Sequence, residues 1–212
     1  DFYHASYPEL AGCGLTPCAH YAGAGWREGR DPAPWFSTRA YLDLYPDVDD
    51  TAVVALALRR CHRAHEAVDR GLAWMAGMQS SSGGWGAFDA DNEAFWLYKL
   101  PFCDFGKVTD EPSADVTAHA LEALAPEAGY DGEVRRGLDW LLAEQEADGS
   151  WFGRWGVNHV YGTGAALPAL EACGVEPSHP AFGRAIAWLD SVQNADGGFG
   201  EDIRYYSDPA WR

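Results

Sequence analysis

Arg136-Gly137-Leu138-Asp139-Trp140, followed by Gln145 and then by Gly149-Ser150-Trp151, is the stretch that decides the fold of this chain. The same order of residue types occurs twice more, with Trp, Gln and a second aromatic residue at the same offsets. These copies are Arg70-Gly71-Leu72-Ala73-Trp74 with Gln79 and Gly83-Gly84-Trp85, and Arg184-Ala185-Ile186-Ala187-Trp188 with Gln193 and Gly197-Gly198-Phe199. Repetition with fixed internal offsets indicates repeated supersecondary units.

Each copy is predicted to be a helix that ends at a glycine-containing turn. Leu138, Leu141 and Leu142 recur at helical spacing, and the glycines that follow the Gln are helix stop signals. A Gln beyond the last turn can hydrogen-bond the free backbone groups of a helix end, and the aromatic residue can pack against the next unit. The aromatic residues assigned to this structural role are Trp85, Trp151 and Phe199.

Further helices are predicted between the copies. They run from Thr51 to about Arg63, from Asp115 to Leu124 with Ser113 as N-cap, and from Gly164 to Ala172, where Pro168 weakens the pattern. No alternating strand pattern is evident. The sequence therefore predicts an all-α fold, an α/α barrel or toroid of repeated helix pairs in which each pair buries its apolar face against its neighbours.

Two segments lack this periodicity. Residues 1–37 are rich in Gly, Pro and Tyr and are predicted to be an irregular N-terminal segment, so that residues 38–212 form the barrel domain. The stretch from Phe88 to Pro112 is predicted to be a long loop, and long ordered loops within a repeat fold are often functional.

Composition excludes several classes of function. The net charge of the 212 residues is −17, which argues against nucleic acid and against electrostatic docking to anionic lipid. Ten Trp, ten Tyr and nine Phe require a large core or an aromatic-lined cavity. The five Cys form no disulfide framework, so a reducing compartment is expected. Cys13, Cys18 and His20 lack a fourth ligand at a convincing spacing, and no metal site is predicted.

Asp47-Val48-Asp49-Asp50-Thr51-Ala52 places three carboxylates within four residues, just before a predicted helix. Clustered like charges cannot all ionise cheaply, so one of the three carboxyl groups can stay protonated and serve as a Brønsted acid. Asp residues also cap helix N-termini and suit the helix dipole, and for this stretch taken alone capping is the simpler interpretation.

The repeats and the acidic stretch resemble the squalene–hopene cyclase family of class II triterpene cyclases. The repeats resemble the QW motifs of that family, and Asp47–Ala52 resembles its DxDD motif. Further matching stretches are Gln79–Asp89, Pro101–Gly106, Val108–Asp110, Pro112–His119, Trp151–Asn158 and Tyr161–Thr163. The resemblance covers about Tyr45 to Pro209.

The resemblance implies a catalytic role for five residues. Asp49 would protonate a terminal alkene of squalene, and Asp47 and Asp50 would tune it. His119 corresponds to the histidine partner of the acid. Asp115 lies four residues before His119 on the same face of the predicted helix, so that an ionised Asp115 would keep His119 charged and oriented. The helix end, with Asp50 as its expected cap, would help to make Asp49 acidic.

The resemblance also implies a substrate cavity and a product. Trp155, Tyr161 and Phe88 correspond to cavity positions, with core packing as the alternative role of Trp155. Phe88 stands where hopene-forming enzymes usually carry Tyr. The residues matching the substrate-channel constriction, otherwise an ordinary packed loop, are Phe102, Cys103, Asp104 and Phe105. The implied reaction is polycyclisation of squalene to hopene-like triterpenes in hopanoid biosynthesis, an isomerase activity without a cofactor.

The family resemblance further implies peripheral, monotopic association of the complete bacterial enzyme with the cytoplasmic side of the membrane, and it allows a homodimer. Because the family extends beyond both ends of this sequence, we expect the barrel of this chain to be incomplete and the chain alone to be inactive.

Other classes of protein remain as alternatives. A protein prenyltransferase-like barrel would need a zinc site of Asp, Cys and His, and a thioester domain would need Glu and Gln where Leu15 and Thr16 follow Gly12-Cys13-Gly14. A non-catalytic barrel fragment is a third alternative. Within the cyclases, Asp49-Asp50-Thr51 points away from the oxidosqualene enzymes, whereas class II cyclases of diphosphate substrates share DxDD.

Overall fold

The computed structural model describes residues 2–10, 13–20, 24–25, 28, 30–31, 46–61, 65–92, 109–206 and 208. It divides into two compact units, Asp1–Pro46 and Asp47–Arg212. In the first unit, α1 (Phe2–Ser6), η1 (Pro8–Leu10) and α2 (Pro17–His20) are short helices, each too short to give a recognisable periodicity in the sequence. The predicted domain boundary at residue 37 lies outside the described residues.

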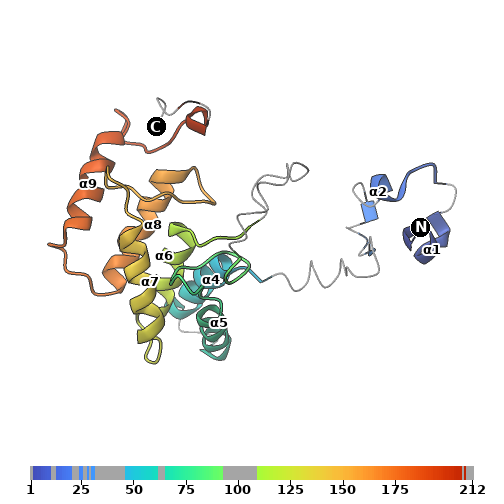
Figure 1. Ribbon diagram of the computed structural model, residues 1–212, viewed down its shortest axis with the longest axis horizontal. Helices are drawn as coiled ribbons and strands as arrows, with labels where there is room; N and C mark the ends of the chain where they lie inside the picture. Colours follow the sequence, from blue (N-terminus) through green and yellow to red (C-terminus); the bar gives the residue numbers. More distant parts are fainter. Residues whose placement is uncertain are drawn as a thin grey trace. The chain divides into compact units, whose positions relative to one another are not determined.

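The second unit is built from helix pairs (Figure 1). They are α4 (Val48–Arg60) with α5 (His65–Gly77), α6 (Ala114–Leu124) with α7 (Asp131–Ala143), and α8 (Asn158–Ala172) with α9 (Pro180–Val192), followed by η4 (Ile203–Tyr206). No strand occurs in the described part of either unit.

Helices α4, α6 and α8 form an inner layer, in which α6 packs against both neighbours. Helices α5, α7 and α9 each pack on the outside of their own partner. The central position of α6 explains its composition, because Val116, Ala120, Leu121 and Leu124 are all completely buried. The small alanines allow close approach of the neighbouring inner helices, and the larger side chains fill the core between the layers.

The glutamines of the repeats join one helix pair to the next. The side-chain nitrogen of Gln79 donates to Gly83 O at 2.7 Å and to Glu133 O, in the first turn of α7, at 2.9 Å. Gln145 makes the same pair of bonds, at 2.8 Å to Gly149 O and at 3.0 Å to Ala181 O in the first turn of α9. Each Gln therefore closes its own turn and holds the next outer helix.

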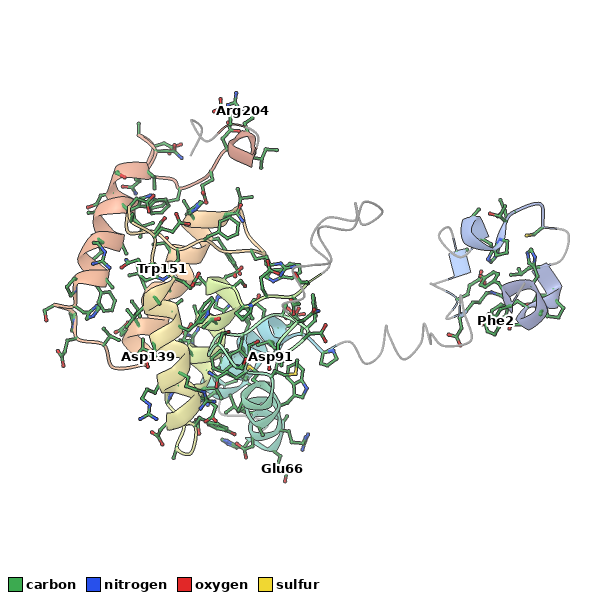
Figure 2. The ribbon with its side chains drawn as sticks, in the orientation of Figure 1. Phe2, Glu66, Asp91, Asp139, Trp151 and Arg204 are labelled. Carbon is green, nitrogen blue, oxygen red and sulfur yellow. The ribbon has the colours of Figure 1, made fainter. Side chains whose placement is uncertain are left out.

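The tryptophans of the first two copies have equivalent places. Trp85 and Trp151 are completely buried (Figure 2 labels Trp151) and donate their indole N–H groups at 2.7 Å to Met75 O and Leu141 O. The structural role predicted for both is thus confirmed. Phe199 differs, since 48% of its surface is exposed and no further helix pair follows it in the described part of the chain.

Two helices begin three or more residues before their predicted starts. Helix α4 begins at Val48 rather than Thr51, because Asp47 is the cap. Helix α8 begins at Asn158 rather than Gly164 and continues through Pro168, although an internal proline costs about 3 kcal/mol. Burial of Ala165, Ala166 and Leu170 against the core offsets that cost.

Candidate active site

Asp47 caps helix α4. Its backbone is extended (φ −116°, ψ 133°), and its side chain accepts a hydrogen bond from Asp50 N at 2.9 Å. The expectation that Asp50 caps the helix is therefore wrong, and Asp50 lies exposed in the first turn. Burial, reinforced by the charges of Asp50 and Asp49, raises the pKa of Asp47. Val48 N donates to Ala87 O at 2.8 Å, which ties this helix end to the loop after the first repeat.

Asp49 and His119 are in direct contact. Asp49 lies in the first turn of α4 and His119 on α6, and Asp49 Oδ1 is hydrogen-bonded to His119 Nδ1. Their side chains are 23% and 17% exposed. The hydrogen bond to Asp49 raises the pKa of His119 above its ordinary value, although burial lowers it, and the charges of Asp49 and Asp115 add to the rise. The inner helices thus bring the carboxyl group of Asp49 into contact with a histidine that is positively charged when protonated.

Asp115 is 1% exposed and lies one turn before His119. Its Oδ2 accepts a hydrogen bond from Trp155 N at 2.8 Å, while its buried Oδ1 has no hydrogen-bond partner among the described residues. Asp115 therefore acts on His119 through its charge and holds the backbone of the loop that carries Trp155.

Tyr161, near the start of α8, faces His119. The two rings lie edge to face with their centroids 6.2 Å apart. The Tyr161 side chain also packs closely on Gly156, where an added Cβ would lie 2.3 Å from Tyr161 Cγ. Burial, followed by the charges of Asp49 and Asp115, raises the pKa of Tyr161. Tyr161 therefore lies beside His119, the partner of Asp49, and its assignment to a substrate cavity stays a prediction.

Phe88 and Trp155 form a second aromatic pair. Their rings lie edge to face with centroids 5.5 Å apart. Phe88 is half-buried, and Trp155 is 49% exposed. Core packing, the alternative role considered for Trp155, does not fit a ring with half of its surface exposed.

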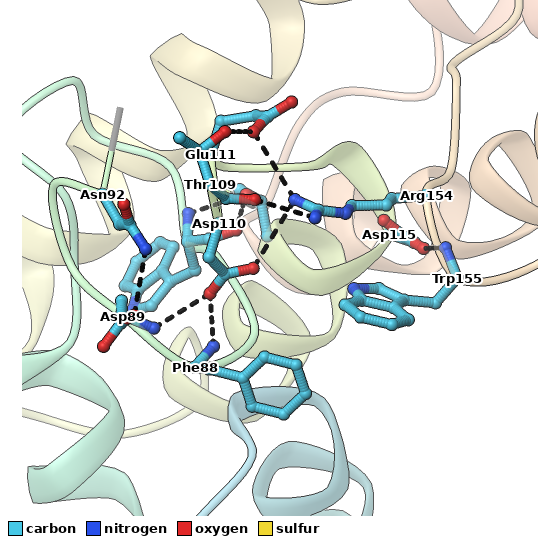
Figure 3. A network of polar contacts seen from close by, with 11 residues as sticks. Phe88, Asp89, Asn92, Thr109, Asp110, Glu111, Asp115, Arg154 and Trp155 are labelled. Carbon is cyan, nitrogen blue, oxygen red and sulfur yellow. Dashed lines mark hydrogen bonds and ion pairs between the residues drawn. The ribbon is translucent and has the colours of Figure 1, made fainter. Parts of the chain in front are cut away.

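Sequence reasoning gave no role to Asp110 and Arg154, which lie next to this pair (Figure 3). Asp110 Oδ2 accepts hydrogen bonds from the backbone N–H groups of Phe88 and Asp89. Arg154 donates to Thr109 O at 2.9 Å, and its guanidinium lies 5.3 Å from the Trp155 ring centroid. Only the adjacency of Arg154 to Trp155 could have indicated this arrangement from the sequence.

The family of the chain follows from its match to known sequences. A family model described as the squalene-hopene cyclase C-terminal domain matches residues 27–212. The chain belongs to this family. The helix pairs accordingly form part of an α/α barrel, as predicted.

Individual squalene–hopene cyclases are also similar to the chain. It is 52% identical to the squalene–hopene cyclase of Alicyclobacillus acidocaldarius and 46% identical to that of Zymomonas mobilis, over 79% and 78% of its length. These alignments cover 28% and 26% of the two relatives, so the chain spans about a quarter of the length of the curated relatives it matches.

The fold is also similar to a solved cyclase structure. The ent-copalyl diphosphate synthase from Streptomyces platensis superposes with a TM-score of 0.55 and 29% sequence identity. The similarity covers 92% of this chain and 32% of the other.

Some expected features of a squalene–hopene cyclase fall outside the described residues or away from the Asp49–His119 pair. Phe102, Cys103, Asp104 and Phe105, the predicted channel residues, lie outside them. A pocket of about 150 Å³ beside Arg154 is not lined by Asp49 or His119. Within the described ranges, no helix is long and apolar enough to cross a membrane, and no group of His, Cys, Asp and Glu is arranged to hold a metal ion.

Proposed function

We propose that this chain carries the proton-donating part of a class II terpene cyclase that acts on squalene. The observation that carries the proposal is the contact between Asp49 and His119 at the start of an inner barrel helix. Membership of the squalene–hopene cyclase family supports the reaction class.

The proposed first step transfers the carboxyl proton of Asp49 to a terminal alkene of squalene. The alkene π electrons form the new C–H bond, a carbocation remains at the neighbouring carbon, and Asp49 becomes a carboxylate. Alkenes are very weak bases, so the step requires strong stabilisation of that carboxylate. His119, protonated and donating to Asp49 Oδ1, supplies a positive charge, and the N-terminus of α4 supplies the helix dipole.

The carbocation then reacts with the remaining double bonds of the substrate, and the last cation loses a proton to solvent to give a neutral isomer of squalene. Aromatic faces stabilise cations by roughly 2 kcal/mol when water is excluded. Tyr161 lies beside His119, and the pair Phe88 and Trp155 lies close to Asp115, whose Oδ2 holds Trp155 N. These three rings are therefore the proposed walls for successive cations, with hopene-like triterpenes as the proposed products.

Squalene is favoured over a diphosphate substrate by the charges around these rings. A diphosphate would need positive charge close to these rings. Arg154 lies over Trp155, but its charge is balanced by Asp110 and Glu111, each 3.6 Å from Nη1. A diphosphate-bearing isoprenoid is the second candidate substrate, because the chain superposes on a copalyl diphosphate synthase.

The test uses the protein encoded by the complete reading frame that contains this sequence. It is incubated separately with squalene and with a linear isoprenoid diphosphate, and polycyclic products are measured. We expect products from squalene and, in Asp49→Asn, a loss of at least about 10³-fold. Asp139→Asn, on the exposed side of α7 (Figure 2), removes the same charge away from the site and is the matched control. Full activity of Asp49→Asn would remove Asp49 from the mechanism, and products from the diphosphate alone would favour the second candidate.

We also propose that the complete enzyme associates peripherally with membranes, because its proposed substrate partitions into lipid. Co-sedimentation of the complete protein with squalene-loaded vesicles tests this. Protein that stays in the supernatant at every lipid concentration would contradict it.

A further inference from the structure

The aromatic rings Phe88 and Trp155 come from different loops, yet both loops are held by buried carboxylates. Phe88 N and Asp89 N donate to Asp110 Oδ2, the latter at 2.9 Å. Trp155 N donates to Asp115 Oδ2 at 2.8 Å. Each ring is thus fixed through its own backbone rather than through its side chain alone.

Arg154 connects the two loops (Figure 3). Its Nη2 donates to Thr109 O at 2.9 Å, and its Nη1 lies 3.6 Å from Asp110 Oδ1. Both side chains are largely buried, so their charges are weakly screened and depend on each other. The guanidinium also lies over the Trp155 ring, 5.3 Å from its centroid.

Gly86 makes room for the contact between Asp110 and the Phe88 loop. A Cβ added to Gly86 would lie 2.4 Å from Asp110 O and 2.8 Å from Asp110 Oδ2. Only a residue without a side chain lets Asp110 approach the Phe88 loop closely enough to accept its two backbone N–H groups. The contact is therefore a specific feature of the loop and not an incidental surface ion pair.

We propose that the Asp110–Arg154 pair is a positioning device that sets the geometry between Phe88 and Trp155 and thereby determines the ratio of products. The inference rests on the proposed cyclase function. Within the described residues, no hydrogen bond or ion pair joins Asp110 or Arg154 to Asp49 or His119. Loss of the pair should therefore change which carbocation is stabilised and leave proton donation in place.

The activity test is a double-mutant cycle in the complete protein, with Asp110→Asn, Arg154→Met and the combined variant. Each single variant should change the ratio of major to minor products from squalene by about threefold, the size expected when a cation–π contact is partly lost. The combined variant should match the single ones, because the two residues act as one unit. Arg154→Lys keeps the charge without the planar fork and should shift the ratio less.

The matched control is Arg135→Met, which removes an exposed arginine of α7 and should leave the ratio unchanged. Effects that multiply in the combined variant would overturn the proposal. So would an unchanged ratio in both single variants, or a loss of all products in equal proportion.

A second readout needs no substrate and so separates this inference from the proposed function. The protein is labelled with 5-fluorotryptophan, and the ¹⁹F signal of Trp155 is assigned by its absence in Trp155→Phe. Asp110 contacts the Phe88 loop and Arg154. If it positions Trp155 through them, Asp110→Asn should move the Trp155 signal. Arg135→Met should leave the signal in place. An unmoved Trp155 signal in Asp110→Asn would overturn the positioning role, whether or not the protein cyclises squalene.

Discussion

His119 Nδ1 on helix α6 is hydrogen-bonded to Asp49 Oδ1 on helix α4, across 70 residues of sequence. The two helices are neighbours in the inner layer, so packing of the barrel itself creates the contact. The same contact stabilises the fold and prepares the proposed acid, and its two effects can be measured separately.

The contribution of His119 to stability should depend on pH. Its pKa is raised in the folded chain, so the native state binds this proton more tightly than the unfolded state does. The stabilisation is present below the ordinary pKa of His and is lost as pH rises through the raised value. In urea unfolding, His119→Gln should lower the free energy of unfolding by about 2 kcal/mol near pH 6, and by progressively less as the pH rises through the raised pKa.

The control for this prediction is His65→Gln, which replaces an exposed histidine at the start of α5. A cost of His119→Gln that stays constant across the pH range would contradict the charged contact.

Asp47 should reveal its capping role through two substitutions. Asp47→Ala removes the hydrogen bond to Asp50 N and should lower the free energy of unfolding by about 1 kcal/mol at neutral pH. Asp47→Asn keeps the cap and removes a partly buried charge whose pKa is raised, so it should unfold at the same or a higher urea concentration. Equal destabilisation by Asn and Ala would show that the charge of Asp47, rather than the cap, matters.

The repeat glutamines should differ in their importance. Gln145 bonds both its own turn and the next outer helix, whereas the exposed Gln193 bonds Gly197 O at 2.9 Å. Gln145→Ala should therefore lower the free energy of unfolding by about 2 kcal/mol, and Gln193→Ala should lower it by less than about 0.5 kcal/mol. Thermal unfolding of the two variants decides this, and equal costs would contradict the proposed link between helix pairs.

Phe88 should influence the products rather than the rate of protonation. Phe88→Tyr retains the aromatic face and adds a hydroxyl group to the wall formed with Trp155. In the complete enzyme, we expect the product mixture from squalene to change by about twofold or more while substrate consumption changes less. An unchanged mixture would remove Phe88 from the cavity.

Much of the fold was predictable because its signals are local. The offsets of Trp74, Trp140 and Trp188 indicated the outer helices, and the four-residue spacing of Asp115 and His119 placed them on one helix face. The exposure of Phe199 was not predictable in this way, because burial of a repeat residue depends on the unit that packs against it.

The rest of the site depends on contacts between loops. Arg154 meets Thr109 across 45 residues, in segments without hydrophobic periodicity, and pairing of that kind leaves no pattern in a single sequence. The capping of α4 by Asp47 rather than Asp50 depends on where the chain turns into the helix, and helix ends are poorly determined by sequence.

The proposed mechanism requires Asp49 to give an exchangeable proton to an alkene. The most direct test is to incubate the complete protein with squalene in D₂O and to locate deuterium in the polycyclic product. We expect a single non-exchangeable deuterium at the CH carbon of the terminal double bond that is protonated, and no such product from Asp49→Asn. A polycyclic product without deuterium, or a deuterated product formed equally well by Asp49→Asn, would contradict it.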